Sequence, residues 1–105
     1  MAIEVEHWDE QSDGALTEAN MRRMLQEKGY EVSRYVYPPG TYFPEHSHGV
    51  DKIDGVLSGS FRMNMHGQRV VLQAGDMLVV PRGVLHSAEV VSHEPVVSLD
   101  AVKRN

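Results

Sequence analysis

Three histidines in two short stretches of the chain could bind one metal ion. His46 and His48 end the stretch Gly40-Thr-Tyr-Phe-Pro-Glu-His-Ser-His, and His86 follows the turn Pro81-Arg-Gly. Side chains two residues apart on an extended strand point to the same face, so His46 and His48 can present two imidazoles to one point. Three neutral imidazoles that converge on one side of a small β-structure make a transition-metal site with coordination positions left open. The spacing therefore predicts a metal centre made by His46, His48 and His86.

The same two stretches resemble the two sequence motifs of the cupin superfamily. The first has the Gly-x5-His-x-His spacing that opens the first motif, and Val56-Leu-Ser-Gly is similar to the turn that closes it. The second stretch, Gly75 to His86, has the spacing Gly-x5-Pro-x-Gly-x2-His of the second motif. The residues between them, 60–74, are similar to the short spacer of small microbial cupins. The resemblance covers Gly40 to Val90 and implies a cupin-type double-stranded β-helix, a jelly-roll barrel, that binds a metal.

Position 52 departs from this family pattern. The Glu that usually serves as a fourth metal ligand in cupins would fall there, and this chain has Lys52 instead. A second departure, Val90 in place of the Asn that usually ends the second motif, does not concern a metal ligand. The three imidazoles are therefore the part of the metal sphere that the resemblance supports.

Four arrangements of Lys52 are open. An ammonium group beside a metal ion in a poorly hydrated pocket is strongly unfavourable, so Lys52 can turn to solvent, or a bulge can bring Asp51 inward as a ligand. Alternatively, Lys52 stays in the pocket paired with Asp54, or it acts as a neutral catalytic lysine. We favour the first arrangement, with water completing the three-His sphere, because residues 50–52 follow a Gly at the flexible approach to a strand.

One helix and a series of short strands are expected to position these residues. Thr17 is a helix N-cap and Gly29 a left-handed stop, so a helix is expected over about 17–28, with an apolar stripe. From residue 30 the hydrophobic period becomes two, which predicts a barrel over about 30–102. The expected strands are 30–37, 53–58, 61–65, 69–73, 77–80, 85–91 and 96–102. Many short strands with even turn spacing predict an all-β jelly-roll barrel with one N-terminal helix.

Three further residues are candidates for the pocket lining and for catalysis. Tyr42 shares strand parity with His46, so it either lines the pocket near the metal or packs in the barrel wall. Asp54 shares parity with Lys52 and would face inward on a regular strand. Tyr42, Lys52 and Asp54 are the candidate catalytic residues. Ser98 and Asp100 alternate with apolar neighbours on the last strand, so one of them could reach the pocket, although we do not expect it.

The composition predicts one small soluble domain, residues 1–105. A chain of 105 residues has room for one hydrophobic core, and its 41% apolar and 24% charged residues argue against disorder. A net charge of −5 without a basic run argues against nucleic acid or an anionic membrane surface as partner. No signal-peptide pattern and no apolar run of roughly 18 residues is found, and there is no cysteine for disulfides or thiolate ligands. We therefore expect a cytoplasmic protein.

Several expected strands are apolar on both faces, notably Met77–Val80 and Val96–Val97. One face can fill the barrel, and the other must also be covered. The cover is either the N-terminal helix with the segment around Ile3, Val5 and Trp8, or a second copy of the chain. Resemblance to small cupins, commonly homodimers, favours a homodimer.

The three-His site suggests a function. The same ligands accept Fe, Ni, Zn, Mn or Cu as a divalent ion. Neutral imidazoles leave the full charge on the ion, which favours anionic, chelating small molecules such as a keto-enolate or a hydroxy-acid. Three-His iron centres in some cupins catalyse dioxygenation, so the first hypothesis is a metal-dependent oxygenase or isomerase. A non-catalytic, metal-stabilised binder or sensor and a metal-free barrel are the alternatives.

Overall fold

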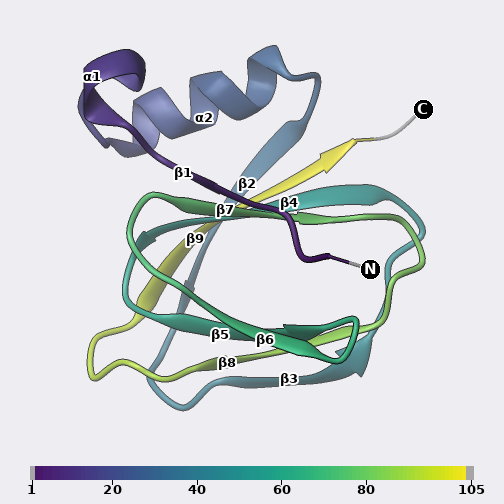
Figure 1. Ribbon diagram of the computed structural model, residues 1–105. Coiled ribbons are helices and arrows are strands. Elements are labelled where there is room, and N and C mark those ends of the chain that lie inside the picture. Colours follow the sequence, from purple (N-terminus) through teal and green to yellow (C-terminus); the bar gives the residue numbers. More distant parts are fainter. Residues whose placement is uncertain (1, 104–105) are drawn as a thin grey trace.

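Two antiparallel β-sheets face each other and form a barrel (Figure 1). The computed structural model describes residues 2–103. In chain order the elements are β1 (Val5–His7), α1 (Glu10–Asp13), α2 (Glu18–Glu27), β2 (Glu31–Tyr37), β3 (Tyr42–His46), β4 (Asp51–Ser58), β5 (Phe61–Met65), β6 (Gln68–Leu72), β7 (Asp76–Val80), β8 (His86–Val90) and β9 (Val96–Lys103). One sheet has the order β1-β7-β4-β9-β2 and the other β3-β8-β5-β6. Apart from the β5–β6 hairpin, successive strands from β2 onward lie in different sheets, as in a jelly roll.

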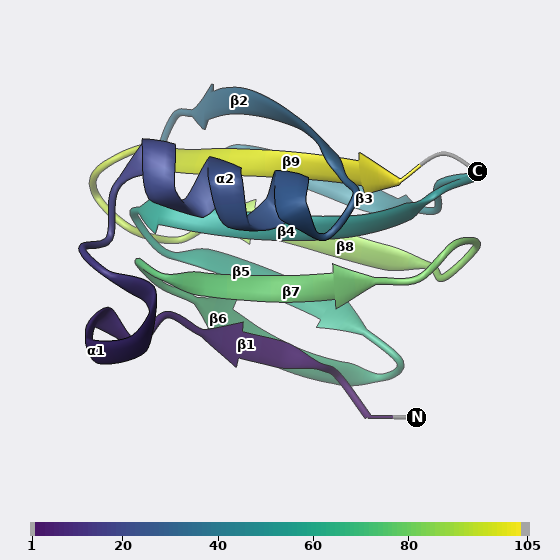
Figure 2. The same ribbon diagram turned by 90° about the horizontal axis from the view of Figure 1, so that it is seen from above.

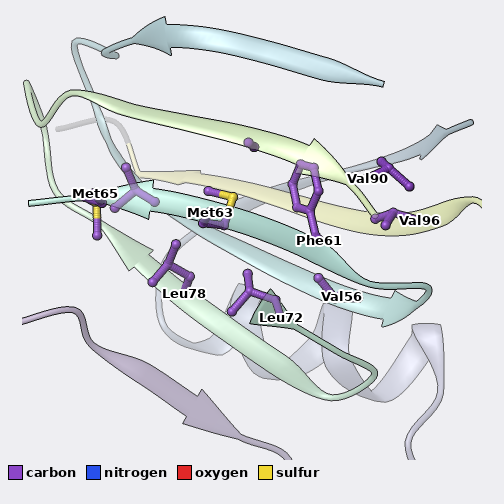
Figure 3. Close-up of a cluster of buried hydrophobic side chains, with 10 residues drawn as sticks. Val56, Phe61, Met63, Met65, Leu72, Leu78, Val90 and Val96 are labelled. Atoms are coloured by element: carbon purple, nitrogen blue, oxygen red, sulfur yellow. The ribbon is translucent and has the colours of Figure 1, made fainter. Parts of the chain in front are cut away.

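A hydrophobic core fills much of the space between the sheets (Figure 3). Strand β5 shows how the sequence builds it, because Phe61, Met63 and Met65 are buried while Arg62 and Asn64 are partly exposed. Alternate residues of a strand point to opposite faces, so one face of β5 supplies the core and the other meets solvent. The expected strand over 61–65 is confirmed without a shift.

Helix α2 begins after Thr17 and ends before Gly29, as the capping residues of the sequence predict. The Thr17 hydroxyl accepts a hydrogen bond from the Asn20 N–H at 3.0 Å, which satisfies a backbone donor of the first turn. Gly29, just beyond the helix, has a φ of 93°, a left-handed conformation that residues with a Cβ adopt at a cost. The expected helix is confirmed, with Glu18–Glu27 as its helical residues.

Helix α2 covers the outer face of the five-stranded sheet (Figure 2). Met21 and Leu25 are fully buried against side chains of β4, β7 and β9. These sheet residues are Ile53, Met77, Leu99 and Ala101. Gly55 allows the close approach, since a Cβ there would lie 2.8 Å from the Met21 sulfur. The outward residues of the doubly apolar segment 77–80, Met77 and Val79, therefore find cover within the chain, with Trp8 and Leu16 also packed against the cluster.

The N-terminal segment is more ordered than expected. β1 pairs with β7 at the edge of the larger sheet, and α1 is a single turn capped by the Asp9 carboxylate, which accepts the Gln11 N–H at 3.0 Å. Neither was expected, because three residues and one helical turn without a buried side chain carry no hydrophobic period. β4 also begins earlier than expected, at Asp51 rather than Ile53, which matters for the site.

Candidate metal centre

Strands β3 and β8 bring the three histidines together. His46 and His86 are directly paired across the two strands, and His48 lies just beyond β3. The ring centroids of His46 and His86 are 4.3 Å apart, and those of His48 lie 4.8 and 5.1 Å from them. One nitrogen from each ring lies within 4.8 Å of the others, so the three side chains could hold one metal ion. The Gly83 N–H donates to the His48 carbonyl at 2.9 Å and ties the two motifs together.

Backbone carbonyls orient two of the imidazoles. The Nδ1 atom of His46 lies 2.6 Å from the Pro44 carbonyl, and that of His86 lies 3.0 Å from the Val84 carbonyl. A carbonyl oxygen can only accept, so each Nδ1 carries the proton and donates it, which leaves the lone pair on Nε2. The Nε2 atom of His48 is buried and has no hydrogen-bond partner among residues 2–103. This donor set fits a divalent first-row transition metal.

The surroundings keep two of these imidazoles neutral. Burial lowers the pKa of His48, and the Lys52 ammonium and the other two imidazoles lower it further. Burial also lowers the pKa of His86, although its backbone hydrogen bond opposes the shift. Because only a neutral imidazole has a lone pair for a metal, the lowered pKa values prepare the cluster for metal binding at neutral pH.

A cavity of about 160 Å³ lies between the sheets beside the histidines. One part of its wall is apolar and the rest is polar or charged. Its lining residues are Tyr37, Phe43, His46, His48, Lys52, Asp54, Phe61, Met63, His86, Ala88, Ser98 and Asp100. A space of this size suits a ligand of a few non-hydrogen atoms rather than a polymer.

Lys52 points into this cavity, so the expected turn to solvent is wrong. Its side chain is 8% exposed, and its Nζ lies 2.8 Å from Asp100 Oδ1 and 3.5 Å from Asp54 Oδ1. The reason is that β4 begins at Asp51, so Lys52 belongs to a regular strand and pairs with Val80 and Val102 on either side. The structure has the third arrangement, pairing with Asp54, and adds Asp100 as a second carboxylate.

Asp51 is not a substitute ligand in this structure. Its Oδ1 accepts the Arg82 N–H at 2.8 Å, and Asp51 is not among the residues that line the cavity. The carboxylate instead holds the Pro81–Gly83 turn that precedes His86. The expected alternative with a bulge at this point is therefore not found.

Charge interactions decide the protonation of the lysine and its partners. Burial alone would lower the pKa of Lys52, but Asp54 and Asp100 outweigh this effect, and the net pKa is raised. The two carboxylates therefore favour the ammonium form over the neutral lysine of the fourth arrangement. Burial raises the pKa of Asp54 to about 6 against the opposing charge of Lys52. Burial and the same two carboxylates also raise the pKa of Tyr37, so its hydroxyl keeps its proton.

Tyr42 does not line the cavity, contrary to one expectation. Its side chain is 59% exposed, and the neighbouring Phe43 lies in the wall instead. The pairing with β8 shifts between Phe43 and His46, where β3 has one residue more than its partner. This bulge breaks the parity on which the expectation rested. Asp54 does face inward, as the regular parity of β4 predicts.

Sequence reasoning did not identify five lining residues, Tyr37, Phe43, Phe61, Met63 and Ala88, and both Ser98 and Asp100 line the cavity although neither was expected there. Ser98 and Asp100 alternate with apolar residues in β9, and Asp100 is directly paired with Asp54. The alternation of polar and apolar residues in β9 was the available signal. It identifies one face of the strand but not which face meets the cavity.

Comparisons with known proteins agree with this architecture. A family model described as Cupin domain matches residues 33–102. A cupin protein from Bacteroides fragilis is 30% identical over 80% of this chain and 73% of its own, with a TM-score of 0.62. A Cupin 2 conserved barrel domain protein from Salinispora arenicola is 25% identical over 72% of this chain and 64% of its own, with a TM-score of 0.64. The DMSP lyase DddQ from Ruegeria pomeroyi is 27% identical over 70% of this chain, with a TM-score of 0.61.

The chain spans less than two thirds of some of these proteins. The match covers 64% of the Salinispora protein and 39% of the lyase. No curated protein gave a significant match. Among residues 2–103, no helix has the length and apolar character needed to cross a membrane.

Proposed function

This chain belongs to the cupin domain family, and we propose that it is a metal-dependent enzyme for a small molecule, of oxygenase or isomerase type. His46, His48 and His86 would hold a divalent transition metal, and the adjoining cavity would hold the substrate. One observation carries the proposal: three imidazoles converge on a cavity while carbonyls take the Nδ1 protons of two of them. The likeness to a DMSP lyase supports catalysis on a small molecule.

The metal, the apolar lining residues and the charged lining residues would have different roles in the site. A bound dication would supply Lewis-acid polarisation of a substrate oxygen and open positions for an anionic, chelating ligand. Phe43, Phe61 and Met63 form an apolar wall that limits water around the substrate. Lys52 and Asp54 provide charge on the side of the five-stranded sheet. The small cavity limits substrates to a few non-hydrogen atoms.

Metal binding is tested first. Protein prepared without a histidine tag is analysed for metals, and the metal-free form is titrated with Fe(II), Ni(II), Zn(II), Mn(II) and Cu(II). About one ion per chain is expected, with tighter binding of the later metals. A wild-type protein that takes up none of these ions would overturn the proposal.

Turnover is tested second. Iron-loaded protein is incubated in air with simple diketones and hydroxy-acids, and oxygen uptake and products are followed. His46→Ala/His86→Ala is the inactive control, and the exposed His93→Ala is the control that should keep activity. One metal per chain without turnover of any substrate would overturn the enzymatic part and support the alternative of a metal-stabilised binding or sensing protein.

We also propose a homodimer, by analogy with small cupins. The apolar outer sheet face no longer supports it, because α2 covers that face. Support comes from the edge strand β2, where Tyr35 and Val36 are 47% and 48% exposed. Light scattering should give about twice the chain mass of 11.8 kDa, and a value near 11.8 kDa at micromolar concentration would refute the dimer.

A further inference from the structure

Lys52 stands where the cupin pattern that this sequence resembles has a Glu, and its side chain lines the cavity. We propose that this lysine selects the substrate by donating a hydrogen bond to a carboxylate whose other donor atoms face the three-His centre. The ligand class is a small carboxylate with a neighbouring oxygen, such as an α-hydroxy or α-keto acid. The inference rests on the proposed metal site and identifies Lys52 as the residue that binds the substrate carboxylate there.

The place of Lys52 in the cavity supports this role. Lys52 lines the cavity together with His46 and His86 of the opposite sheet and with His48, which lies just beyond β3. The ammonium group on β4 and the imidazoles at β3 and β8 therefore line one small cavity of about 160 Å³ from different sheets. A ligand bound at the imidazoles therefore has Lys52 across the cavity from it.

The ammonium group keeps a donor for a ligand. It has three N–H donors and no lone pair, so it cannot replace the missing metal ligand. Its ion-pair partners among residues 2–103 are two, Asp100 at 2.8 Å and Asp54 at 3.5 Å. Even if each contact uses one donor, a third remains. The carboxylates also hold the group protonated, so it can act as a donor but not as a base.

The charges of the cavity match one carboxylate. Without metal, Lys52 against Asp54 and Asp100 leaves one negative charge in excess, which repels an anion. A bound dication changes this to one positive charge in excess. Attraction in a poorly hydrated cavity is strong, so a monoanion is favoured after metal binding and disfavoured before it. Anion binding should therefore need the metal, and the hydrogen bond from Lys52 should strengthen it.

The test compares glycolate with glycolamide, which share their carbon skeleton and hydroxyl and differ in charge. Both are titrated into zinc-loaded protein and followed by two-dimensional NMR of the backbone amides, which needs no turnover. Wild type should bind glycolate more tightly than glycolamide. Lys52→Met should reduce this preference by about tenfold or more, chiefly through weaker glycolate binding, as expected for loss of one charge-assisted hydrogen bond. Lys52→Arg should retain most of it.

A control separates hydrogen bonding from net charge. Lys52→Met alone leaves Asp54 and Asp100 without a partner, and their charge could itself repel glycolate. In Lys52→Met/Asp54→Asn/Asp100→Asn this charge is removed, so the metal-loaded cavity is more positive than in wild type. If net charge alone sets the preference for glycolate, it should be stronger in this variant than in wild type, whereas our proposal predicts that it stays reduced, because the hydrogen bond from Lys52 is missing. The triple variant also serves if the single variant fails to fold.

The outcomes are distinct for the two proposals. Failure of wild type to bind zinc overturns the metal site and this inference with it. Zinc binding with an equal glycolate preference in wild type and the triple variant overturns the role of Lys52 and leaves the metal site standing. Tight glycolate binding by metal-free wild type would also contradict the inference, because the cavity would then attract anions without the dication.

Discussion

The two faces of strands β4 and β9 reverse the usual order of a soluble barrel. Beside the site, their outward side chains are apolar and buried beneath α2, while their inward side chains are polar or charged and line the cavity, and only farther along do Val56 and Val96 join the core. The outward residues are Ile53, Leu99 and Ala101, and the inward residues are Lys52, Asp54, Ser98 and Asp100. Strand β5, in the other sheet, has the ordinary order with apolar residues inside. Around the site, the larger sheet therefore takes much of its stability from the face that looks away from the cavity.

This contrast predicts that metal affinity depends on the residues that face the cavity and not on those packed beneath α2. His86→Ala should lower metal affinity by more than about 100-fold, because it removes one of three ligands and leaves the apolar core in place. Competition with a chelator measures the affinity, and thermal unfolding checks the fold. His93→Ala, at an exposed position, should change neither. Stoichiometric metal in His46→Ala/His86→Ala would show that the ligands lie elsewhere.

The ion pairs that face the cavity should contribute more to the free energy of unfolding than an ion pair at the surface. Lys52→Met is expected to lower the free energy of unfolding by about 3–5 kcal/mol, because Asp54 and Asp100 lose their buried partner. Lys28→Met breaks the exposed pair with Glu6 and should cost less than about 1 kcal/mol. Urea unfolding of both variants measures the difference. Equal losses would mean that the inner ion pairs are as well solvated as the surface pair.

The outer face should control stability without controlling the site. Leu25→Ala removes a fully buried side chain between α2 and the sheet and should cost about 3 kcal/mol. Gln26→Ala, at the exposed neighbouring position, should cost less than about 0.5 kcal/mol. Folded Leu25→Ala protein should still take up the wild-type amount of metal. A loss of metal binding in the folded variant would show that the two faces are coupled.

The smallest expected effect is a pH dependence at Asp54. Its pKa is raised from 3.8 to about 6 in the folded protein, so the folded state holds the proton more tightly than the unfolded state. The resulting stabilisation is fully present below the unfolded pKa and is lost as the pH rises towards the folded value. Compared with Asp54→Asn, metal-free wild type should therefore lose on the order of 2 kcal/mol of stability between about pH 4 and pH 6. A difference that is constant or grows with pH would contradict the raised pKa.

Local spacing explains what the sequence could predict. His46 and His48 are two residues apart, and His86 follows a short turn, so the cluster depends on motifs that are contiguous in the chain. The fold was predictable for the same reason, since β5 and α2 carry unbroken hydrophobic periods. The strand parity of Asp54 correctly predicted that its side chain faces the cavity, because β4 is regular from Asp51 to Val56.

Strand pairing explains what the sequence could not predict. The orientation of Lys52 depends on β4 pairing with β7 and β9 from its first residues, and no residue near Lys52 encodes that pairing. Asp100 reaches the cavity because its strand lies beside β4, although the two aspartates are far apart in the chain. The exposure of Tyr42 depends on a bulge that appears only in the pairing of β3 with β8. Each of these features is set by a partner strand.

The bulge in β3 also allows the cavity wall to be changed by protein engineering independently of the three histidines. Because of the extra residue between Phe43 and His46, the part of β3 before the bulge and the histidines after it pair with β8 in different registers. An insertion or deletion before the bulge therefore need not change the direction in which the imidazoles point. Deleting Glu45, an exposed residue of the bulge, would restore simple alternation and turn Tyr42 inward in place of Phe43. Removal of one residue would thus exchange a phenyl ring for a phenol in the part of the wall that β3 contributes.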